Sequence, residues 1–397
     1  MAVPGLRFLF ARRGESWLTL VRLGWRSLRA EGLGATWRRV RGYAGMVNAA
    51  AATPLPPPTT RKDVLFVAGC PGHPRRWRCE HALEGLRAAG RDGDLVDHPA
   101  APLLDYVDRY REFVLQRVPH DAGVEAFVRA AKARGRRVVV DVDDLVIHER
   151  YVADVPPLAH ELYAQGRRRI GQVLALVDEA TCPTAPLAAE LQACFPHLRV
   201  QVVRNVASRA MVERSDAAVA RAPEVAADGT VTIGYFAGTR THDRDLATIA
   251  AALAEVLALR PQVRLLLAGE IDVPRALAAF GARVARRDPV PWPELPALLR
   301  QADVHVVPLV DEPFSRCKSE LKWVEAALVG RPVVAAAVGP FRDCVRHGAN
   351  GWLAATPAQF VPHLLAAIDD AALRVRLGAA ARADAQRGWT TAPRAAT

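Results

Sequence analysis

The basic side chains of this 397-residue chain include a pair of lysines whose spacing suits an anion. Lys318 and Lys322 are two of only four lysines, whereas the chain holds 49 arginines, and they are four residues apart. An ammonium group is a compact point charge and a guanidinium is a planar fork, so the two are not interchangeable at a tight phosphate site. The pair therefore favours a place where ammonium groups face a phosphate.

The turn after Gly238 is a second candidate anion site. It opens onto a predicted helix, where backbone N–H groups can hold a phosphate, and Arg240, His242 and Arg244 crowd it. The alternative interpretation is an ordinary solvated helix start. Neither G-x-G-x-x-G nor G-x-x-x-x-G-K-S/T occurs, which argues against a nicotinamide dinucleotide site and against a P-loop ATPase.

Three aspartates, Asp141, Asp143 and Asp144, follow an apolar run that begins after Arg137. Residues two apart on a strand point to the same side, so Asp141 and Asp143 form a D-x-D pair that could hold Mg²⁺ or Mn²⁺ through oxygen ligands. We interpret Asp144 as a helix cap or turn residue.

Apolar runs of strand length alternate with helical segments in both halves of the chain. Strands are predicted at 64–68, 112–117, 137–142, 178–182, 200–203, 231–236, 263–268, 304–308 and 333–337, and helices at 78–89, 124–134, 244–259 and 369–388. This alternation indicates parallel sheets covered on both faces. We predict an α/β protein of two Rossmann-like, doubly wound domains that bind ligands at the carboxyl ends of their strands, in the cleft between the domains.

The predicted domain boundaries follow changes in composition. They are a basic amphipathic arm with a Pro-rich linker at 1–60, an N-terminal domain at 61–206, an interdomain linker at 207–229, a C-terminal domain at 230–368, and a helix and tail at 369–397 that pack back on the N-terminal domain. The linker assignment rests on a polar stretch without a clear period.

The arm carries most of the net charge. Residues 1–50 hold nine Arg and two Glu, and so seven of the +11 charges of the chain. Trp17, Val21, Trp25 and Leu28 recur at helical spacing, with arginines away from that face. A basic amphipathic helix with Trp on its apolar side suits an anionic membrane surface. Packing of the same stripe on the body of the protein is an equal alternative.

Composition narrows the class of protein. With 51% hydrophobic and 24% charged residues, the chain is globular rather than disordered. No apolar run approaches the ~18 residues of a membrane-spanning helix, and the run that includes Leu6 and Phe10 is cut short at Arg12, which argues against a cleavable signal peptide. Six cysteines without a C-x-x-C pair favour reduced thiols in a cytosol.

Residues 231–389 resemble the nucleotide-sugar-binding domain of the group 1 glycosyltransferases, the large family 4 of retaining enzymes. The matching segments are Leu265–Gly269, Val290–Leu295 followed by Ala302–Val304 and Pro308, Glu325–Val334, and Gly339–Gly351. The third, E-A-A-L-V-G-R-P-V-V, is similar to the family's strongest signature. The resemblance implies a GT-B-type architecture and transfer of a hexose-type sugar from a nucleoside diphosphate with retention of configuration.

The resemblance also implies a Glu-x7-Glu pair. The signature anchors the second member at Glu325, which in the family holds the ribose hydroxyls, and Cys317 stands eight residues earlier. The family's sugar-contacting Glu is therefore missing. Glu312 and Glu320 have the same spacing, which we interpret as chance.

The site residues that the resemblance implies lie in both halves. Donor-binding residues are Gly238, Thr239, Arg240, Arg244, Pro291, Trp292, Lys318, Ser319 and Glu325; acceptor-binding residues are Gly72, Arg76 and Arg78; catalytic residues are Asp143, Lys318 and Arg244. Asp143 stands where the family often has a histidine. Because the donor phosphates fall in the C-terminal half, away from the D-x-D pair, we expect neither a metal nor another cofactor.

The expected partners are a nucleotide sugar and a glycan or lipid-linked acceptor of cell-surface polysaccharide biosynthesis. We expect a cytoplasmic enzyme, peripheral at the inner face of the cell membrane. The alternatives are a nucleotide-sugar epimerase of the same architecture and a catalytically silent nucleotide-sugar-binding homologue, the latter because of Cys317 and Asp143. Nucleic acid is not expected, since most of the net basic charge lies in residues 1–50 and no nucleic-acid-binding fold is recognised.

Overall fold

The computed structural model describes residues 55–147, 160–221, 228–238 and 242–391. The predicted arm, residues 1–54, and the site residues Thr239 and Arg240 lie outside this part of the chain. The described residues form two units. Unit 1 runs to Pro183 and includes Ala188–Val203, and unit 2 contains Thr184–Leu187 and the chain from Arg204.

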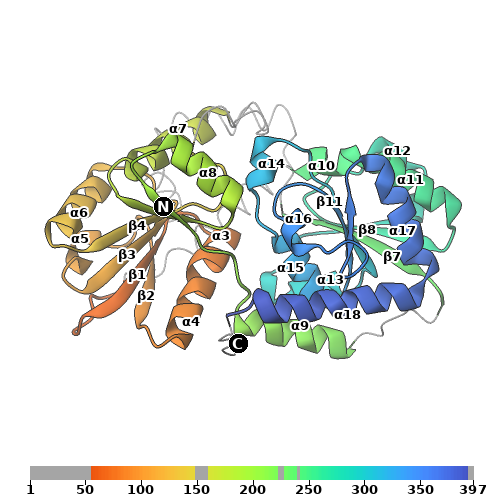
Figure 1. Cartoon of the computed structure of the whole chain (residues 1–397), viewed down its shortest axis with the longest axis horizontal. Coiled ribbons are helices and arrows are strands. Elements are labelled where there is room, and N and C mark those ends of the chain that lie inside the picture. Colours follow the sequence, from red (N-terminus) through yellow and green to blue (C-terminus); the bar gives the residue numbers. More distant parts are fainter. Residues whose placement is uncertain (1–54, 148–159, 222–227, 239–241, 392–397) are drawn as a thin grey trace, which may run out of the picture. The chain divides into compact units, whose positions relative to one another are not determined.

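Unit 1 is built on a parallel sheet with strand order β2-β1-β3-β4-β5-β6 (Figure 1). Its strands are β1 (Lys62–Ala68), β2 (Gly93–Asp97), β3 (Tyr110–Gln116), β4 (Arg137–Asp141), β5 (Glu179–Cys182) and β6 (Arg199–Val202). Its helices are α3 (His73–Arg75), the π-helical turn η1 (Arg76–Glu80), α4 (His81–Ala88), α5 (Leu103–Tyr106), α6 (Ala122–Ala133), α7 (His160–Leu174) and α8 (Ala185–Cys194), whose first residues group with unit 2.

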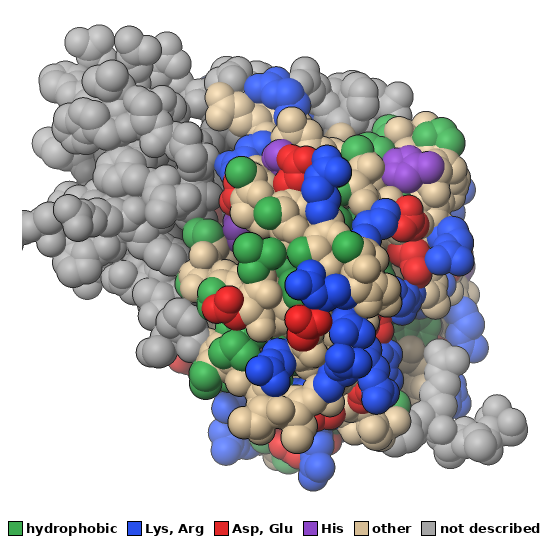
Figure 2. All heavy atoms as spheres, turned by 90° about the vertical axis from the view of Figure 1, so that its left-hand side faces the viewer, with side chains coloured by type: hydrophobic (Ala, Val, Ile, Leu, Met, Phe, Trp, Pro, Cys, Tyr) green, Lys and Arg blue, Asp and Glu red, His purple; other side chains and the backbone are tan. Residues whose placement is uncertain are grey.

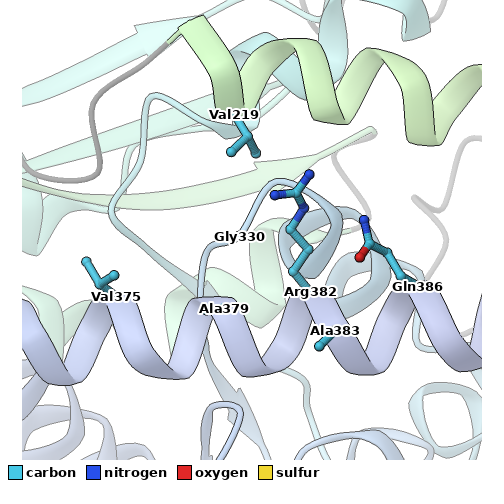
Figure 3. A pocket seen from close by; sticks show the side chains of 7 residues that line it. All are labelled: Val219, Gly330, Val375, Ala379, Arg382, Ala383 and Gln386. Carbon is cyan, nitrogen blue, oxygen red and sulfur yellow. The ribbon is translucent and has the colours of Figure 1, made fainter.

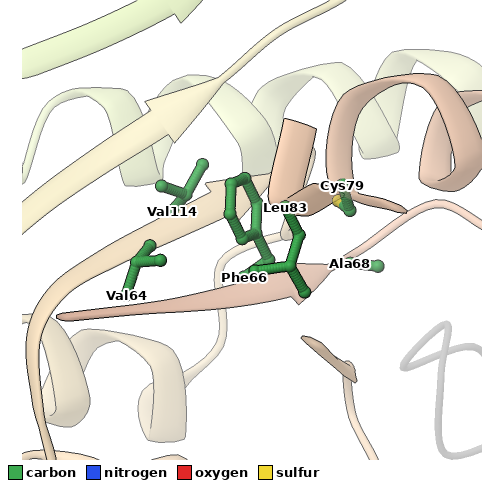
Figure 4. Packing of buried hydrophobic residues seen from close by; sticks show 6 residues of the cluster. All are labelled: Val64, Phe66, Ala68, Cys79, Leu83 and Val114. Carbon is green, nitrogen blue, oxygen red and sulfur yellow. The ribbon is translucent and has the colours of Figure 1, made fainter. Parts of the chain in front are cut away.

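The core of unit 1 shows why β1 forms where it does. Alternate residues of a strand point to one face, and Val64, Phe66 and Ala68 of β1 pack with Cys79 and Leu83 of η1 and α4 (Figure 4). The residues between them, Leu65 and Val67, are also buried. A strand buried on both faces reads as a continuous apolar run, as expected for a parallel sheet.

Unit 2 is built on a second parallel sheet, with strand order β12-β11-β10-β7-β8-β9. Its strands are β7 (Val231–Ala237), β8 (Val263–Gly269), β9 (Val284–Arg287), β10 (Val304–Val307), β11 (Val333–Ala336) and β12 (Trp352–Ala354). Its helices are α9 (Arg209–Arg221), α10 (Asp243–Thr248), α11 (Ala250–Leu259), α12 (Arg275–Ala278), η5 (Gly281–Arg283), η6 (Trp292–Glu294), α13 (Leu295–Leu299), α14 (Pro313–Cys317), α15 (Leu321–Leu328), α16 (Phe341–Cys344), η7 (Pro357–Gln359), α17 (Phe360–Asp369) and α18 (Ala371–Gly388).

Both sheets are doubly wound, so each has a point at which the strand order reverses. In unit 1 the chain moves outward on opposite sides of the β1–β3 pair, and in unit 2 on opposite sides of the β7–β10 pair. Ligands of such sheets bind at this switch point, outside the carboxyl ends of the strands. The predicted fold class is confirmed. The strands that the sequence did not predict, β2, β9 and β12, are edge strands of three to five residues without a long apolar run.

The predicted interdomain linker at 207–229 is wrong for most of its described length. Residues Arg209–Arg221 form α9, which packs on α13 and α15 of unit 2. Met211, Ser215 and Ala218 are its buried residues. Their spacing of four and three residues is helical, but a serine in the middle of the stripe hid the period.

The C-terminal helix α18 also belongs to unit 2, whereas the sequence predicted that it packs on the N-terminal domain. It packs on α15 and α17. A Cβ on Gly378 would lie 2.2 Å from the carbonyl oxygen of Gly330, so glycine is required for this close approach. A cavity of about 230 Å³ remains between α18 and α9, lined by Val219, Gly330, Val375, Ala379, Arg382, Ala383 and Gln386 (Figure 3). In the described part of the chain, no helix is long and apolar enough to cross a membrane.

Candidate functional site

The switch point of unit 2 gathers polar side chains from three segments that are far apart in the sequence. Helices α10 and α14 follow β7 and β10 and lie side by side at the carboxyl edge of the sheet (Figure 1). Arg244 of α10 forms an ion pair of 2.9 Å with Glu312, which precedes α14. Lys318 lies between α14 and α15, and Lys322 lies in the first turn of α15.

The buried carboxylate of Asp245 contacts three groups from different segments of this site. Its Oδ1 accepts a hydrogen bond of 3.1 Å from the backbone N–H of Val310, and its Oδ2 lies 3.0 Å from Nδ1 of His242 and 3.8 Å from Nζ of Lys318. Burial alone would raise the pKa of Asp245, but His242, Lys318 and the Val310 N–H hold that pKa below its ordinary value. Asp245 is therefore an ionised counter-ion for the basic groups around it.

Lys322 carries an ammonium group with no hydrogen-bond partner among the described residues. Its Nζ is buried, although part of the side chain is exposed, and it lies 5.0 Å from the ring centroid of Tyr235. Burial and the charge of Lys318 lower the pKa of Lys322 to about 8. A buried charged group without a hydrogen-bond partner is costly, so this ammonium group suits an anion that binds beside it.

His242 is neutral in this arrangement. The positive charge of Lys322, together with burial, lowers the pKa of His242 to about 4. The backbone carbonyl of His242 accepts a hydrogen bond of 2.8 Å from the hydroxyl of Tyr235. The positive charge at the switch point therefore comes from Lys318 and Lys322, which we call the lysine pair, and from Arg244 at its rim.

Three other predicted donor-binding residues, Ser319, Glu325 and Gly238, lie in the described part of unit 2. Ser319 follows Lys318 and accepts a hydrogen bond of 2.9 Å from the amide of Asn205. Glu325 is half-buried on α15, one turn after Lys322. Gly238 is exposed at the end of β7.

Pro291 and Trp292 follow β9, the edge strand, which is separated from β7 by β8. Pro291 is exposed, and the guanidinium of Arg214 on α9 lies 5.5 Å from the ring centroid of Trp292. The structure thus places Trp292 by α9, and Pro291 just before it, rather than at the β7–β10 switch point.

The structure separates the roles of Glu312 and Glu320. Glu312 pairs with Arg244 at the rim of the site. Glu320 is 1% exposed and accepts a hydrogen bond of 2.7 Å from the indole N–H of Trp389, while Arg204 lies 3.4 Å away. Glu320 therefore anchors the chain after α18. Cys317, at the position of the missing glutamate, is buried at the end of α14.

In unit 1, the predicted acceptor residue Arg78 has a structural role. Its Nε and Nη2 donate to both carboxylate oxygens of Asp141 at 3.0 and 2.6 Å, and its Nη1 donates to the carbonyl of Val203 at 2.7 Å. Both members of the pair are buried, and Thr181 donates a further hydrogen bond of 2.7 Å to Asp141. The guanidinium donors of Arg78 are thus committed to the protein, because η1 turns this side chain toward the end of β4.

The remaining predicted residues of unit 1 lie near the carboxyl ends of its strands. Gly72 is exposed, and Arg76 is buried with its Nη2 3.2 Å from Nδ1 of His73. Asp143 pairs with Arg117 at 3.2 Å. Since Arg78 engages Asp141 and Arg117 engages Asp143, each member of the D-x-D pair faces its own guanidinium.

The sequence drew attention to the spacing of the two lysines, but Lys322 was not among the predicted donor-binding residues, and Asp245 was missed. The signal available was the crowding of acids and bases in His242–Asp245 and the four-residue spacing of the lysine pair. Neither pattern predicts that Asp245 is buried or that the ammonium group of Lys322 lies over the ring of Tyr235 in β7.

A hollow of about 410 Å³ lies in unit 1 at the amino ends of its strands, at the edge of the sheet opposite to the carboxyl ends. It is lined by Lys132, Gly135, Arg136, Arg137, Val138, Asp178, Glu179 and Arg199. Its cations are paired: Arg137 and Arg199 share Glu179, and Lys132 lies 2.8 Å from Asp178. Figure 2, which views unit 1 from the side, shows Lys and Arg interspersed with Asp and Glu on this part of the surface. This edge is a network of ion pairs at the amino ends of the strands.

The fold of the two units defines a class of protein, because ligands of doubly wound sheets bind at the switch point, where unit 2 gathers its cations. Two such units in succession constitute the GT-B fold. HepE of Anabaena has this fold, with a TM-score of 0.54 and 16% identity over 83% of this chain and 96% of that one. Sucrose-phosphate synthase of Thermosynechococcus elongatus matches with a TM-score of 0.56 and 17% identity over 83% and 95%.

Within this class, residues 230–370 match the family model of the group 1 glycosyl transferases. D-inositol 3-phosphate glycosyltransferase of Thermobispora bispora is 32% identical over 238 residues, which are 55% of this chain and 54% of that protein. The enzyme of the same name from Segniliparus rotundus is 31% identical over 213 residues, 50% and 45% of the two chains. The chain thus spans about half the length of the curated relatives it matches.

Proposed function

We propose that this protein is a retaining glycosyltransferase that moves a hexose-type sugar from a nucleoside diphosphate to a hydroxyl group of an acceptor. The observation that carries the proposal is the buried Nζ of Lys322, which has no hydrogen-bond partner in the described chain and lies beside Lys318 at the switch point of unit 2. A diphosphate supplies the oxygen acceptors that this ammonium group lacks. HepE, which has the same fold, forms complexes with UDP and with UDP-glucose, and this supports a nucleotide-sugar donor.

In this proposal the lysine pair stabilises the leaving diphosphate. The barrier to glycosyl transfer lies in separating a diphosphate from a sugar that becomes oxocarbenium-like, and charge placed in advance near the leaving oxygens lowers that barrier. Lys318 directly follows α14 and Lys322 lies in the first turn of α15, so only three residues separate the two ammonium groups. Asp245 fixes the position of Lys318 without contacting Lys322 at hydrogen-bond distance. Glu325, on the same helix, holds the ribose hydroxyls.

We propose that this chemistry requires no metal ion. Asp141 and Asp143, which together could serve as a metal-binding pair, are engaged by Arg78 and Arg117. Purified protein is tested for binding of UDP and GDP and for sugar transfer from UDP- and GDP-sugars, in the presence and absence of a chelator. This tests both the glycosyltransferase function and its independence of metal. Binding of UDP or GDP that persists in chelator is the expected result. Failure of every nucleoside diphosphate to bind would remove the proposed function, and strict dependence on a divalent ion would remove its metal-free part.

For the acceptor, we propose a glycan or the sugar of a lipid-linked glycan in cell-surface polysaccharide biosynthesis. The curated relatives take their name from D-inositol 3-phosphate, which makes an inositol phosphate a second candidate. We place the reaction in the cytoplasm at the inner face of the membrane, where the basic arm supplies attachment. An epimerase remains the rival function. Analysis of the products formed from a nucleotide sugar without acceptor separates the two, because only an epimerase would convert the donor sugar to its isomer.

A further inference from the structure

The chain enters unit 2 at two places, and near both entry points a side chain reaches the same loop. Unit 2 contains Thr184–Leu187 and then the chain from Arg204. The loop consists of Lys318 and its two neighbours, Cys317 and Ser319, and leads from α14 toward α15. We call these three residues the lysine loop. The contacts described below all lie within unit 2.

Thr184 holds the residue before Lys318. Its side chain is buried, and its hydroxyl donates a hydrogen bond of 3.0 Å to the carbonyl oxygen of Cys317, the last residue of α14. Carbonyl groups in the last turn of a helix have no partner inside that helix, so Thr184 supplies a donor that α14 cannot provide. The same hydroxyl accepts from the backbone N–H of Leu187 at 3.4 Å, in the first turn of α8. Thr184 thus ties the start of α8 to the lysine loop.

Asn205 holds the residue after Lys318. It is 3% exposed, and its Nδ2 donates a hydrogen bond of 2.9 Å to the hydroxyl oxygen of Ser319. The segment that carries Asn205 is itself anchored. The N–H of Ala207 donates to the carbonyl of Trp389 at 2.7 Å, and the N–H of Thr391 donates to the carbonyl of Ala207 at 2.9 Å. Asn205 therefore connects Ser319 to a stretch of paired backbone.

Lys318 depends on these two supports because the contacts of its ammonium group are long. Nζ lies 3.8 Å from Oδ2 of Asp245 and 5.2 Å from the ring centroid of Phe314, whereas a hydrogen bond between nitrogen and oxygen is about 2.9 Å. The ammonium group also stands on a flexible four-carbon stem. Its place at the switch point is therefore set by the backbone from which the stem begins, as well as by the charge of Asp245.

We propose that Thr184 and Asn205 are positioning residues for sugar transfer at the switch point of unit 2. They restrain the backbone before and after Lys318, and so hold its ammonium group where the leaving diphosphate binds. Charge that is in place before the reaction stabilises a leaving group without reorganisation, so donor binding depends on the two entry points of the chain. The proposal rests on the proposed function for the identity of the ligand as a diphosphate. The restraint of the lysine loop rests on the contacts alone.

Two nearly isosteric variants of the full chain remove the supports one at a time. Thr184→Val removes the hydroxyl that reaches Cys317, and Asn205→Leu removes the amide that reaches Ser319. We expect calorimetry to show that each variant weakens UDP or GDP binding about three- to tenfold, the range of one lost hydrogen bond. Thr184→Ser keeps the hydroxyl and should bind as the wild type does. In a Lys318→Met background neither variant should weaken binding further, because the group that they position is absent.

Chemical labelling follows the lysine loop without any nucleotide. The full-length protein is treated with an acetylating reagent, and mass spectrometry of its peptides gives the rate at which each lysine is modified. Lys318 exposes 17% of its side chain. We expect Thr184→Val and Asn205→Leu to speed the acetylation of Lys318 several-fold, because its backbone is released. Lys132 of unit 1 should react at the same rate in every variant.

The controls separate positioning from folding and from the donor assignment. Ser215→Ala removes a buried hydroxyl that donates to the carbonyl of Met211 within α9, and it should change neither measurement. Variants are compared at an unchanged melting temperature, and Thr184→Ala or Asn205→Ala replaces one that unfolds. Unchanged affinity or unchanged Lys318 acetylation in both variants, or an equal loss of affinity in the Lys318→Met background, overturns the proposal. A wild-type protein that binds neither UDP nor GDP overturns the proposed function instead, and acetylation alone then decides whether the two residues restrain the lysine loop.

Discussion

The carboxylate of Asp245 and the imidazole of His242 form a 3.0 Å hydrogen bond at the switch point of unit 2. An ionised carboxylate only accepts hydrogen bonds, so the proton of the neutral ring lies on Nδ1 and leaves Nε2 as an acceptor. His242 therefore does not donate to a phosphate in the free protein. The same carboxylate also accepts from Val310, which ties the turn after β7 to the loop after β10. This division of roles leaves the lysine pair as the proposed anion-binding element.

Replacing Lys322 with methionine should stabilise the protein and weaken its ligand. Loss of a buried ammonium group without a hydrogen-bond partner should raise the free energy of unfolding by about 1–3 kcal/mol. Loss of its contact with a diphosphate should cost about 1.5–3 kcal/mol of binding. Urea denaturation and UDP or GDP calorimetry measure the two effects. Lys132→Met, on unit 1, is the matched control. A less stable variant with unchanged nucleotide affinity would contradict the assignment.

Diphosphate binding should be linked to proton uptake above the pKa of Lys322, which is about 8. A bound anion raises that pKa, because it stabilises the ammonium form. Below pH 8, Lys322 is protonated in both states and no linkage arises. Above pH 8, binding must take up a proton, so affinity falls by up to about tenfold per pH unit. Calorimetry about one unit above this pKa, in two buffers of different ionisation enthalpy, measures the uptake. It should vanish in Lys322→Met.

Glu325→Gln should weaken nucleotide binding, whereas Glu320→Gln should lower the stability of the protein. Glu325→Gln removes a charge-assisted hydrogen bond to the ribose and should weaken UDP or GDP binding by about 1.5–3 kcal/mol at unchanged stability. Glu320→Gln buries an amide donor beside Trp389 and should cost about 1–3 kcal/mol of unfolding free energy with little effect on the nucleotide. Calorimetry and thermal denaturation of both variants decide the placement. The reverse pattern would move the ribose contact to Glu320.

Arg78→Met should be strongly destabilising, because it leaves Asp141 buried without its partner. Breaking such a pair costs about 3–5 kcal/mol. Adding Asp141→Asn should recover part of this loss, since the uncompensated charge is then removed. Urea denaturation of the single and double variants measures the coupling. Arg129→Met, which breaks an exposed pair with Glu125, should change stability by less than about 1 kcal/mol. An Arg78→Met protein of wild-type stability would restore Arg78 as a candidate acceptor contact.

Removal of residues 1–52 should separate membrane attachment from folding. Each basic residue near an anionic surface contributes about 1 kcal/mol, and residues 1–50 carry a surplus of seven positive charges. We expect the truncated protein to lose salt-sensitive sedimentation with vesicles rich in anionic lipid while its melting temperature stays nearly unchanged. Unchanged vesicle binding, together with loss of solubility, would show that the arm packs on the body of the protein.

The strands that lie inside each sheet were predictable from the sequence. Strands buried on both faces, such as β1 and β10, read as unbroken apolar runs, and that property is local. Edge strands such as β9, which reads V-A-R-R, are half exposed and leave no such run. Helix α9 escaped prediction because its buried stripe includes Ser215, which satisfies its hydroxyl on the carbonyl of Met211.

The sequence by itself determined the doubly wound class and the group 1 signature that contains Glu325, and it drew attention to the lysine pair. Only the tertiary structure decided which charges remain available. Arg78 and Asp141 meet across 63 residues, and Arg244 and Glu312 across 68. Which side chains meet over such distances depends on the order of the strands in the sheet. The local periodicity of the sequence does not reveal that order. The same physics leaves Lys322 without a hydrogen-bond partner in the described chain, because the packing of α15 on the sheet places its ammonium group against Tyr235 rather than against a carboxylate.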